Sequence, residues 1–190
     1  MSDVVLREAW RKGDPSIERD AELFWRANRA LPHGVDVGNR LSELCAAAYV
    51  DGQPLAISTS SIRNVDFLRT RLAMYRVFVS PDARVAKVAS KLTLFSRDVL
   101  EDWSREHQRE VVMGMGAVIQ SRALVKNDRA AVWPDSKLTF VGYTQEGYQM
   151  RVYWFAHATV STYWPGEESE SPVKDVRGAF GSGRSIADHE

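Results

Sequence analysis

The chain has 190 residues, of which 44% are hydrophobic and 26% are charged, within the range of ordinary globular proteins. Its 25 basic and 25 acidic residues give a formal net charge of zero. The composition therefore excludes the overall positive charge typical of proteins that bind nucleic acid or anionic lipid, and such a role would depend on a local patch.

The chain carries no recognisable targeting or membrane signal. Its first ten residues, MSDVVLREAW, include charges and lack the apolar core of a secretion signal, and no apolar stretch approaches the ~18 residues needed to span a bilayer. The single cysteine, Cys45, excludes an internal disulfide framework, and within LCAAAYV we expect it to be a small buried hydrophobic residue. We expect no membrane contact and a cytoplasmic location.

The N-terminal quarter predicts one strand and one helix. Residues 4–10 alternate weakly between apolar and polar and indicate a strand. Asp14 followed by Pro15 is typical of a helix N-cap with proline at the first helical position, and the apolar spacing continues to a stop near Pro32. Residues 33–40 contain two glycines and are predicted to form a loop.

The middle and end of the chain predict a sheet with helices on its faces. Asp51-Gly52 is a strong hairpin signal between two short β-type runs. The further predicted elements are strands at 44–50, 55–62, 72–79 and 111–119, helices at 84–107 and 121–133, and a closing hairpin that turns near residues 145–147. This order indicates an α/β or α+β domain.

The composition changes at Pro165. Residues 165–190 are rich in glycine, serine and acidic residues and contain few apolar ones. We therefore expect one domain over residues 1–164 followed by a flexible tail, which could alternatively bind a partner.

The junction between the strand at 72–79 and the helix at 84–107 is an unusual place for positive charge. The first N–H groups of a helix lack partners within the helix and, together with the helix dipole, favour anions. Arg84 and Lys87 stand in this first turn, where cations oppose the dipole. A bound phosphate would reverse that effect; two side chains that point into water are the alternative.

At these residues the sequence resembles the GNAT superfamily of acyl-CoA-dependent N-acyltransferases. Residues 84–89, RVAKVA, match the first and last positions of the family's pyrophosphate loop, Q/R-x-x-G-x-G/A, and Leu92 falls where the family carries an apolar residue. VFVSP resembles the strand before that loop, and FVGYTQEGYQMRVYWF resembles the last two strands, with Gly142-Tyr143 at the place of the usual Gly-Phe. The resemblance covers roughly residues 4–160.

The resemblance implies a mixed, mostly antiparallel central sheet with helices on both faces, and acetyl-CoA as cofactor. An acetyl or other short acyl group would pass to a primary amine by direct attack. In such folds the fourth and fifth strands splay apart and pantetheine pairs with strand amides between them; Gly114 and Gly116 on the fifth strand could permit a bulge or serve packing. The implied cofactor-binding residues are Val77, Phe78, Val79, Arg84, Val85, Ala86, Lys87, Val88 and Ala89.

Two departures from the family pattern bear on activity. Lys87 stands where the family prefers glycine, so its side chain could obstruct a diphosphate or reach round to it. Trp133 is the nearest counterpart of the tyrosine with which many members protonate the departing thiolate, and an indole has no acidic hydroxyl. These residues favour one alternative, a GNAT-like binding module without catalysis.

Candidate catalytic residues are Tyr143, His157 and Asn127. His157 could remove an amine proton near neutral pH, Tyr143 (like Tyr75) could protonate the sulfur, and Asn127 resembles an asparagine many relatives place after the fifth strand. Each also has an ordinary structural interpretation: a hydrogen-bonded strand histidine, a core aromatic residue, and a helix cap.

The acceptor cannot be read from the sequence, but charge gives an indication. Residues 61–91 hold seven basic residues against two acidic ones, and CoA accounts for part of this excess. Arg63, Arg69 and Arg71 remain, and they are predicted to bind an acidic or phosphate-bearing acceptor, either a small molecule or a peptide. A solvated arginine loop and a nucleobase-modifying enzyme of the Mom type are the alternatives, and a homodimer is a further expectation.

Overall fold

The computed structural model describes residues 3–31, 34–81 and 88–160, so residues 84–87 of the predicted pyrophosphate loop and the predicted tail, 165–190, lie outside the described residues. The chain divides into two units, 1–158 and 159–190, and the helices and strands described here belong to the first. The strands are β1 (Val5–Glu8), β2 (Leu44–Val50), β3 (Gln53–Val65), β4 (Thr70–Val79), β5 (Val112–Ile119), β6 (Thr139–Tyr143) and β7 (Gln149–Trp154).

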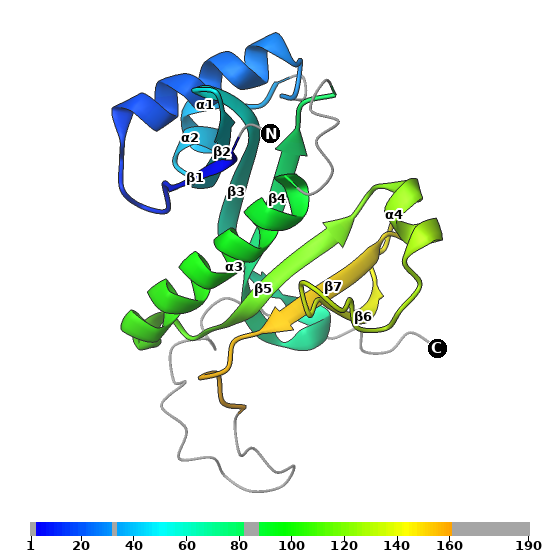
Figure 1. Cartoon of the computed structure of the whole chain (residues 1–190). Coiled ribbons are helices and arrows are strands. Elements are labelled where there is room, and N and C mark those ends of the chain that lie inside the picture. Colours follow the sequence, from blue (N-terminus) through cyan, green and yellow to red (C-terminus); the bar gives the residue numbers. More distant parts are fainter. Residues whose placement is uncertain (1–2, 32–33, 82–87, 161–190) are drawn as a thin grey trace, which may run out of the picture. The chain divides into compact units, whose positions relative to one another are not determined.

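The strands form one sheet in the order β1-β2-β3-β4-β5-β7-β6 (Figure 1). All neighbouring strands are antiparallel except β4 and β5, which are parallel. A parallel pair needs a crossover, and α3 (Val88–Glu106) provides it between these two strands. The predicted mixed, mostly antiparallel sheet is therefore confirmed.

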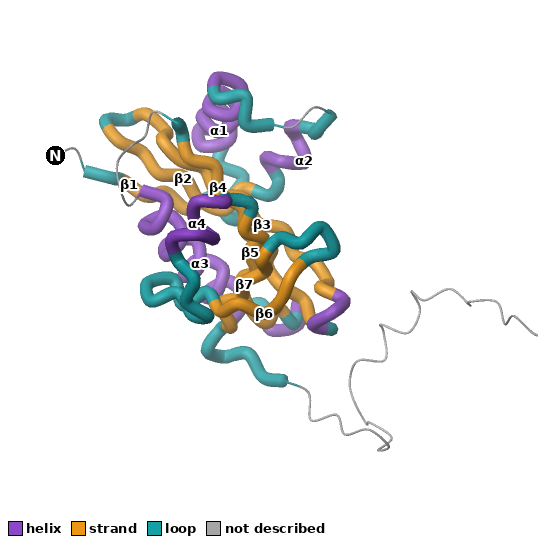
Figure 2. The backbone as a smooth tube through the Cα atoms, turned by 90° about the vertical axis from the view of Figure 1, so that its right-hand side faces the viewer, coloured by secondary structure: helices purple, strands orange, loops and turns teal. Residues whose placement is uncertain are grey.

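Helices cover both faces of the sheet (Figure 2). Successive residues of a strand point to opposite faces. Ile57 and Phe78 accordingly pack with α1 (Pro15–Ala27), whereas Ala56 and Val79 pack with α3. The fully buried run Ala46–Ala48 in β2 divides in the same way: its middle residue lies beneath α1 and the outer two beneath α3.

The start of α1 is confirmed, because the Asp14 carboxylate accepts hydrogen bonds from the backbone N–H groups of Ser16 (2.9 Å) and Ile17 (3.3 Å). The predicted loop at 33–40 is wrong in part, since α2 (Val37–Leu41) lies there. Asp36 caps α2 by accepting from the Asn39 N–H at 2.7 Å. Gly34 just before this short helix and Gly38 within it obscured the cap in the sequence.

The helix predicted at 121–133 is too long. The structure contains only α4 (Arg122–Asn127), because Asp128 has the extended torsions φ −129° and ψ 92°. The Asp128 carboxylate accepts from the Ala130 N–H at 3.3 Å, a local turn that competes with helix. Residues 129–138 therefore form an irregular segment, and Trp133 lies there rather than on a helix.

Cys45 is completely buried, as predicted, and burial raises the pKa of its thiol to about 12. The thiol is therefore a packing group and not a nucleophile near neutral pH. Within the described part of the chain, no helix is long and apolar enough to cross a membrane, and no group of His, Cys, Asp and Glu side chains could hold a metal ion.

Candidate active site

The strands β4 and β5 pair over only part of their length. Their last paired residues are Tyr75 and Ala117, yet β4 continues to Val79 and β5 to Ile119. Figure 1 shows the two strands diverging beyond this point. A gap therefore opens in the middle of the sheet, while β4 remains paired with β3 along its whole length.

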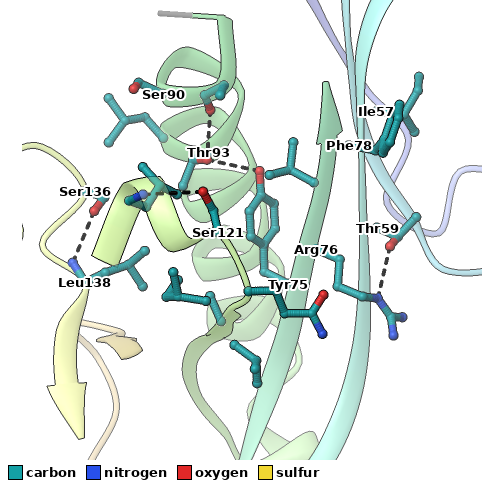
Figure 3. Close-up of a pocket in the computed structure, with 18 of the residues that line it drawn as sticks. Ile57, Thr59, Tyr75, Arg76, Phe78, Ser90, Thr93, Ser121, Ser136 and Leu138 are labelled. Atoms are coloured by element: carbon teal, nitrogen blue, oxygen red, sulfur yellow. Dashed lines mark hydrogen bonds between the residues drawn. The ribbon is translucent and has the colours of Figure 1, made fainter. Parts of the chain in front are cut away.

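A cleft of about 580 Å³ occupies this gap (Figure 3). It is bounded by α1 and the segment after it on one side, and by α3, α4 and the irregular segment on the other. The described residues that line it are Trp25, Ala30, Leu31, Arg40, Ile57, Thr59, residues 75–78, Ala89, Ser90, Thr93, Leu94, residues 117–121, Leu124, Asp128, residues 133–136 and Leu138.

Backbone groups of β4 face the gap. The Ser80 N–H donates to the Leu55 carbonyl of the β3 segment at 2.9 Å. Because backbone groups alternate sides along a strand, those of Val77 and Val79 point away from β3, toward the space from which β5 has departed. The gap thus offers strand N–H and C=O groups to a ligand in an extended conformation.

The first described turn of α3 borders the same cleft, since Ala89 and Ser90 line it. Val88, just before them, is buried against β2 and β3 and fixes the helix on the sheet. Of the predicted cofactor-binding residues, Val77, Phe78 and Ala89 line the cleft. Residues 84–87 lie outside the described residues.

Tyr75 lies where the gap begins. Thr93 Oγ1 donates to the Ala89 carbonyl at 2.8 Å, so the Tyr75 hydroxyl, 3.1 Å from Thr93 Oγ1, is the donor in that contact. Burial is the main reason why the pKa of Tyr75 is raised above its ordinary value. A phenol with a raised pKa and an engaged proton is a weak acid for a departing thiolate.

Two carboxylates that sequence analysis missed, Asp128 and Asp135, belong to the described lining of the cleft, which includes no histidine. Asp128 is the C-cap of α4, and Asp135 lies in the irregular segment 129–138; the helix predicted at 121–133 included the first of them but not the second. Trp133 lies between them and donates its indole N–H to the Asp128 carbonyl at 3.3 Å. The only sequence signal was their position after the fifth strand.

Three arginines surround Glu43. Arg40 contacts its carboxylate at 3.2 Å, Arg76 also binds it, and Arg63 lies 3.7 Å away. Burial, and then the positive charge of Arg40, lower the pKa of Arg76. Arg40 and Arg76 line the cleft, and sequence analysis assigned neither of them to the site.

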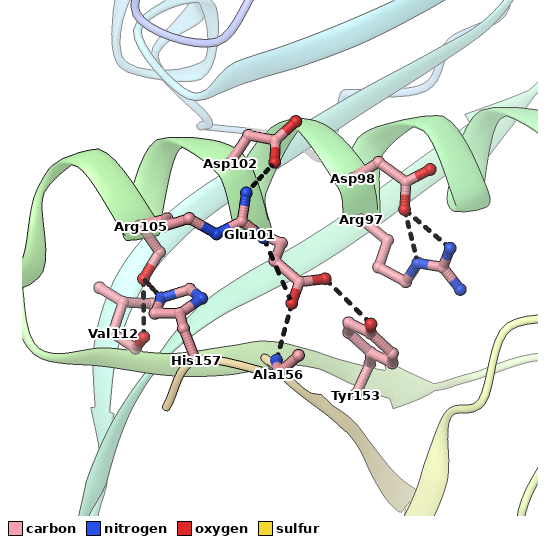
Figure 4. A network of polar contacts seen from close by, with 10 residues as sticks. Arg97, Asp98, Glu101, Asp102, Arg105, Val112, Tyr153, Ala156 and His157 are labelled. Carbon is pink, nitrogen blue, oxygen red and sulfur yellow. Dashed lines mark hydrogen bonds and ion pairs between the residues drawn. The ribbon is translucent and has the colours of Figure 1, made fainter. Parts of the chain in front are cut away.

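The structure brings neither Tyr143 nor His157 to the cleft. Tyr143, at the end of the edge strand β6, is 61% exposed and packs edge-to-face on Phe140. His157 belongs to a polar network between α3 and the end of β7, in which its Nε2 lies 3.2 Å from Ser104 Oγ (Figure 4). These two predicted catalytic residues therefore have no contact with the site, whereas Asn127 is the last residue of α4, next to Asp128.

The predicted acceptor-binding arginines are also not part of the cleft lining. Arg69 lies in the turn between β3 and β4, and Arg71 binds the Glu110 carboxylate at 3.2 Å, near the start of β4. Arg63 reaches the site only indirectly, through Glu43. Within the described part of this basic segment, Arg69 and Arg71 therefore lie near the start of β4, whereas Arg63 and Arg76 lie at Glu43.

Gly114 and Gly116 lie in the paired part of β5, before the gap. An extra β5 residue falls between the pairs Arg71–Val112 and Ala73–Met115, which agrees with the bulge considered for this strand. A Cβ on Gly114 would lie 2.3 Å from the Tyr153 carbonyl oxygen. Close approach to β7, and not ligand binding, explains this glycine.

No protein-family model matches the sequence, and neither does any curated protein sequence. Solved structures do match. The structure of yncA, a putative acetyltransferase from Salmonella typhimurium with its cofactor acetyl-CoA, is 18% identical, with a TM-score of 0.51 over 83% of this chain and 96% of that one. The apo form of an agmatine N-acetyltransferase mutant is 10% identical, with a TM-score of 0.51 over 80% of this chain and 99% of that one.

These comparisons establish the fold. The chain shares the fold of these acetyltransferases, so the predicted GNAT-like fold is confirmed.

Proposed function

We propose that the protein is an acyl-CoA-dependent N-acyltransferase that moves an acetyl or other short acyl group to a primary amine. The observation that carries this proposal is the gap between β4 and β5, into which Val77 and Val79 direct unpaired strand groups beside the first turn of α3. The similar fold of yncA, a structure that contains acetyl-CoA, supports the same cofactor here.

In this proposal the strand groups of Val77–Val79 would hold the pantetheine arm, and residues 84–89 would hold the diphosphate, as the resemblance of this segment to the pyrophosphate loop implies. A β4 backbone N–H that faces the gap would donate a hydrogen bond to the thioester carbonyl oxygen, on which negative charge develops during the attack. The amine nitrogen attacks that carbon, a C–N bond forms, the C–S bond breaks, and the sulfur leaves as thiolate.

The amine proton goes to a base, and Asp128 and Asp135 are the carboxylates available in the described lining, directly or through one water. Asn127, the third predicted catalytic residue, is the last residue of α4 and directly precedes Asp128. Tyr143 and His157 receive no role in this mechanism, because neither lines the cleft.

The strand amide can be tested with Val77→Pro. Proline removes the N–H that faces the gap but leaves the β3 ladder intact, because Val77 does not donate to β3. We expect acetyl-CoA affinity, measured by calorimetry, to fall at least tenfold, while Val77→Ala, which keeps the N–H, stays within about threefold. Equal affinity for both variants, each with an unchanged melting temperature, would remove the β4 amide from the site.

The predicted diphosphate contact is tested separately. Arg84→Glu places a negative charge where a diphosphate should bind, and we expect at least a tenfold loss of acetyl-CoA affinity with an unchanged melting temperature. Unchanged affinity would contradict the diphosphate position.

A catalytically silent binding module is the second candidate. Trp133 in the cleft favours it, because an indole has no acidic hydroxyl, and the Tyr75 hydroxyl in the same lining has its proton engaged with Thr93. Calorimetry followed by a thiol-release assay separates the two functions: binding of acetyl-CoA without release of CoA across a panel of amines favours the silent module.

A further inference from the structure

Arginine side chains mark one face of the cleft. Thr59 and Arg76 are register partners on β3 and β4, and Arg76 Nε lies 3.5 Å from Thr59 Oγ1 (Figure 3). They share the α1 face of the sheet with Ile57 and Phe78, which pack against α1. Arg40 reaches the same cleft from α2.

The positive charge of this cluster is only partly neutralised. Arg40, Arg63 and Arg76 share one carboxylate, that of Glu43, and within the described residues they form no other ion pair. Three guanidinium groups and one carboxylate leave a local charge of two positive units. A guanidinium has five N–H donors, whereas a carboxylate offers about four acceptor sites, so donors remain available.

The cluster lies at the border between the protein interior and water. The side chains of Arg40 and Glu43 are only 17% and 19% exposed, whereas those of Arg76 and Arg63 are 49% and 65% exposed. The half-exposed guanidinium of Arg76 is therefore accessible to a ligand, and an anion beside the largely buried Arg40 is attracted more strongly than in bulk water, because attraction between charges strengthens as water is excluded. Paired guanidinium groups match the geometry of a carboxylate or a phosphate.

The position of Arg76 relates the cluster to the transfer step. Arg76 directly precedes Val77, whose backbone groups face the gap, and both residues line the cleft, so the proposed anion site and the proposed pantetheine site share this part of β4. Trp25, Leu31 and Phe78 add an apolar wall to the same side of the cleft.

We propose that the acyl acceptor is a small amine that also carries an anionic group, a carboxylate or a phosphate, which Arg40 and Arg76 bind on the α1 face of the cleft. This inference rests on the proposed N-acyltransferase function. The step remains balanced: the amine gives up one proton, the thiolate gains one, and the anionic group is unchanged.

The test uses pairs of amines that differ in the anionic group: phenylalanine against phenethylamine for a carboxylate, and phosphoethanolamine against ethanolamine for a phosphate. Both thiol release from acetyl-CoA and amine affinity in the presence of CoA are measured on the full chain. We expect at least a tenfold preference for the anionic member of one pair, which identifies the group. Equal values in both pairs overturn the inference.

Variants test whether Arg76 is responsible for the preference for the anionic amine. Arg76→Gln should reduce the anionic-to-neutral ratio at least fivefold, and Arg76→Lys, which keeps the charge but loses the two-pronged geometry, should give an intermediate ratio. The matched control is Arg26→Gln, which removes an exposed arginine of α1 that pairs with Glu22 outside the cleft and should leave the ratio unchanged. An unchanged ratio in Arg76→Gln overturns the assignment.

Calorimetry with acetyl-CoA distinguishes failure of the proposed function from failure of the inference about the acceptor. Absence of acetyl-CoA binding by the wild-type chain overturns both the proposed function and this inference. Acetyl-CoA binding with equal use of both members of each pair overturns the inference alone. If no amine is acetylated, the affinity ratio decides the inference, and the transferase function fails independently of it.

Discussion

Replacement of Gly114 by alanine is expected to lower the free energy of unfolding by about 3 kcal/mol, at the upper end of what overpacking costs. The new Cβ would lie 2.3 Å from the Tyr153 carbonyl oxygen and 3.2 Å from the Trp154 Cα. Both are backbone atoms of β7, paired with β5 at this position, so no side-chain rotation can relieve the clash. Urea unfolding of the purified variant measures the loss.

Gly116→Ala is the matched control, because it makes the same change in the same strand. Its Cβ would meet only side-chain atoms, Met74 Sδ at 2.8 Å, Leu72 Cδ1 at 3.1 Å and Met150 Cε at 3.4 Å. Methionine is flexible and can move, so we expect a loss below about 1 kcal/mol. Similar losses in the two variants would show that the approach of β7 does not explain Gly114.

Elements specified by local chemistry were predictable from the sequence. Asp51 and Gly52 have φ angles of 49° and 77°, the left-handed conformations that a tight hairpin turn requires and that an Asp-Gly pair supplies. The regular apolar spacing of α3 and the Asp14 cap of α1 likewise depend on residues within a few positions of each other. Such local signals can be recognised in the sequence without the tertiary structure.

The arginines of the cleft were not predictable in this way. Arg71 and Arg76 belong to one basic run, but five strand residues span about 17 Å and the two side chains point to opposite faces. Arg71 therefore meets Glu110, whereas Arg76 meets Glu43, which lies 33 positions away in the sequence. Arg40 was not predicted to line the cleft, because the short helix α2 that carries it was predicted as a loop.

The predicted catalytic residues show a related limit. Tyr143 and His157 were predicted because a phenol can donate a proton and an imidazole can accept one. The ability of a side chain to transfer a proton does not indicate whether it lies near the cleft. The site depends on where β4 and β5 stop pairing, at Tyr75 and Ala117, a long-range feature without a composition signal. The carboxylates of the cleft lie at the C-cap of α4 and in the irregular segment that follows it, which has no periodicity to read.

That irregular segment depends on one buried arginine. Arg151, on β7, is 2% exposed and its Nη1 donates to the carbonyl oxygens of Ala130 (2.9 Å), Ala131 (3.4 Å) and Leu138 (3.4 Å). Its guanidinium also lies over the Trp133 ring, 4.3 Å from the ring centroid. These contacts hold residues 130–138, part of which lines the cleft, against the sheet.

Arg151→Met is therefore expected to lower the free energy of unfolding by about 3 kcal/mol, because it removes charge-assisted hydrogen bonds and leaves the Leu138 carbonyl without this donor. Arg151→Lys keeps one cation but cannot reach several carbonyls at once, so we expect a loss between that of Met and zero. The same order should appear in acetyl-CoA affinity measured below the unfolding transition, since Trp133 and its neighbours shape the cleft. A loss of stability without any change in affinity would show that the segment supports the fold but not the site, and a loss below about 1 kcal/mol in Arg151→Met would show that neither depends on this arginine.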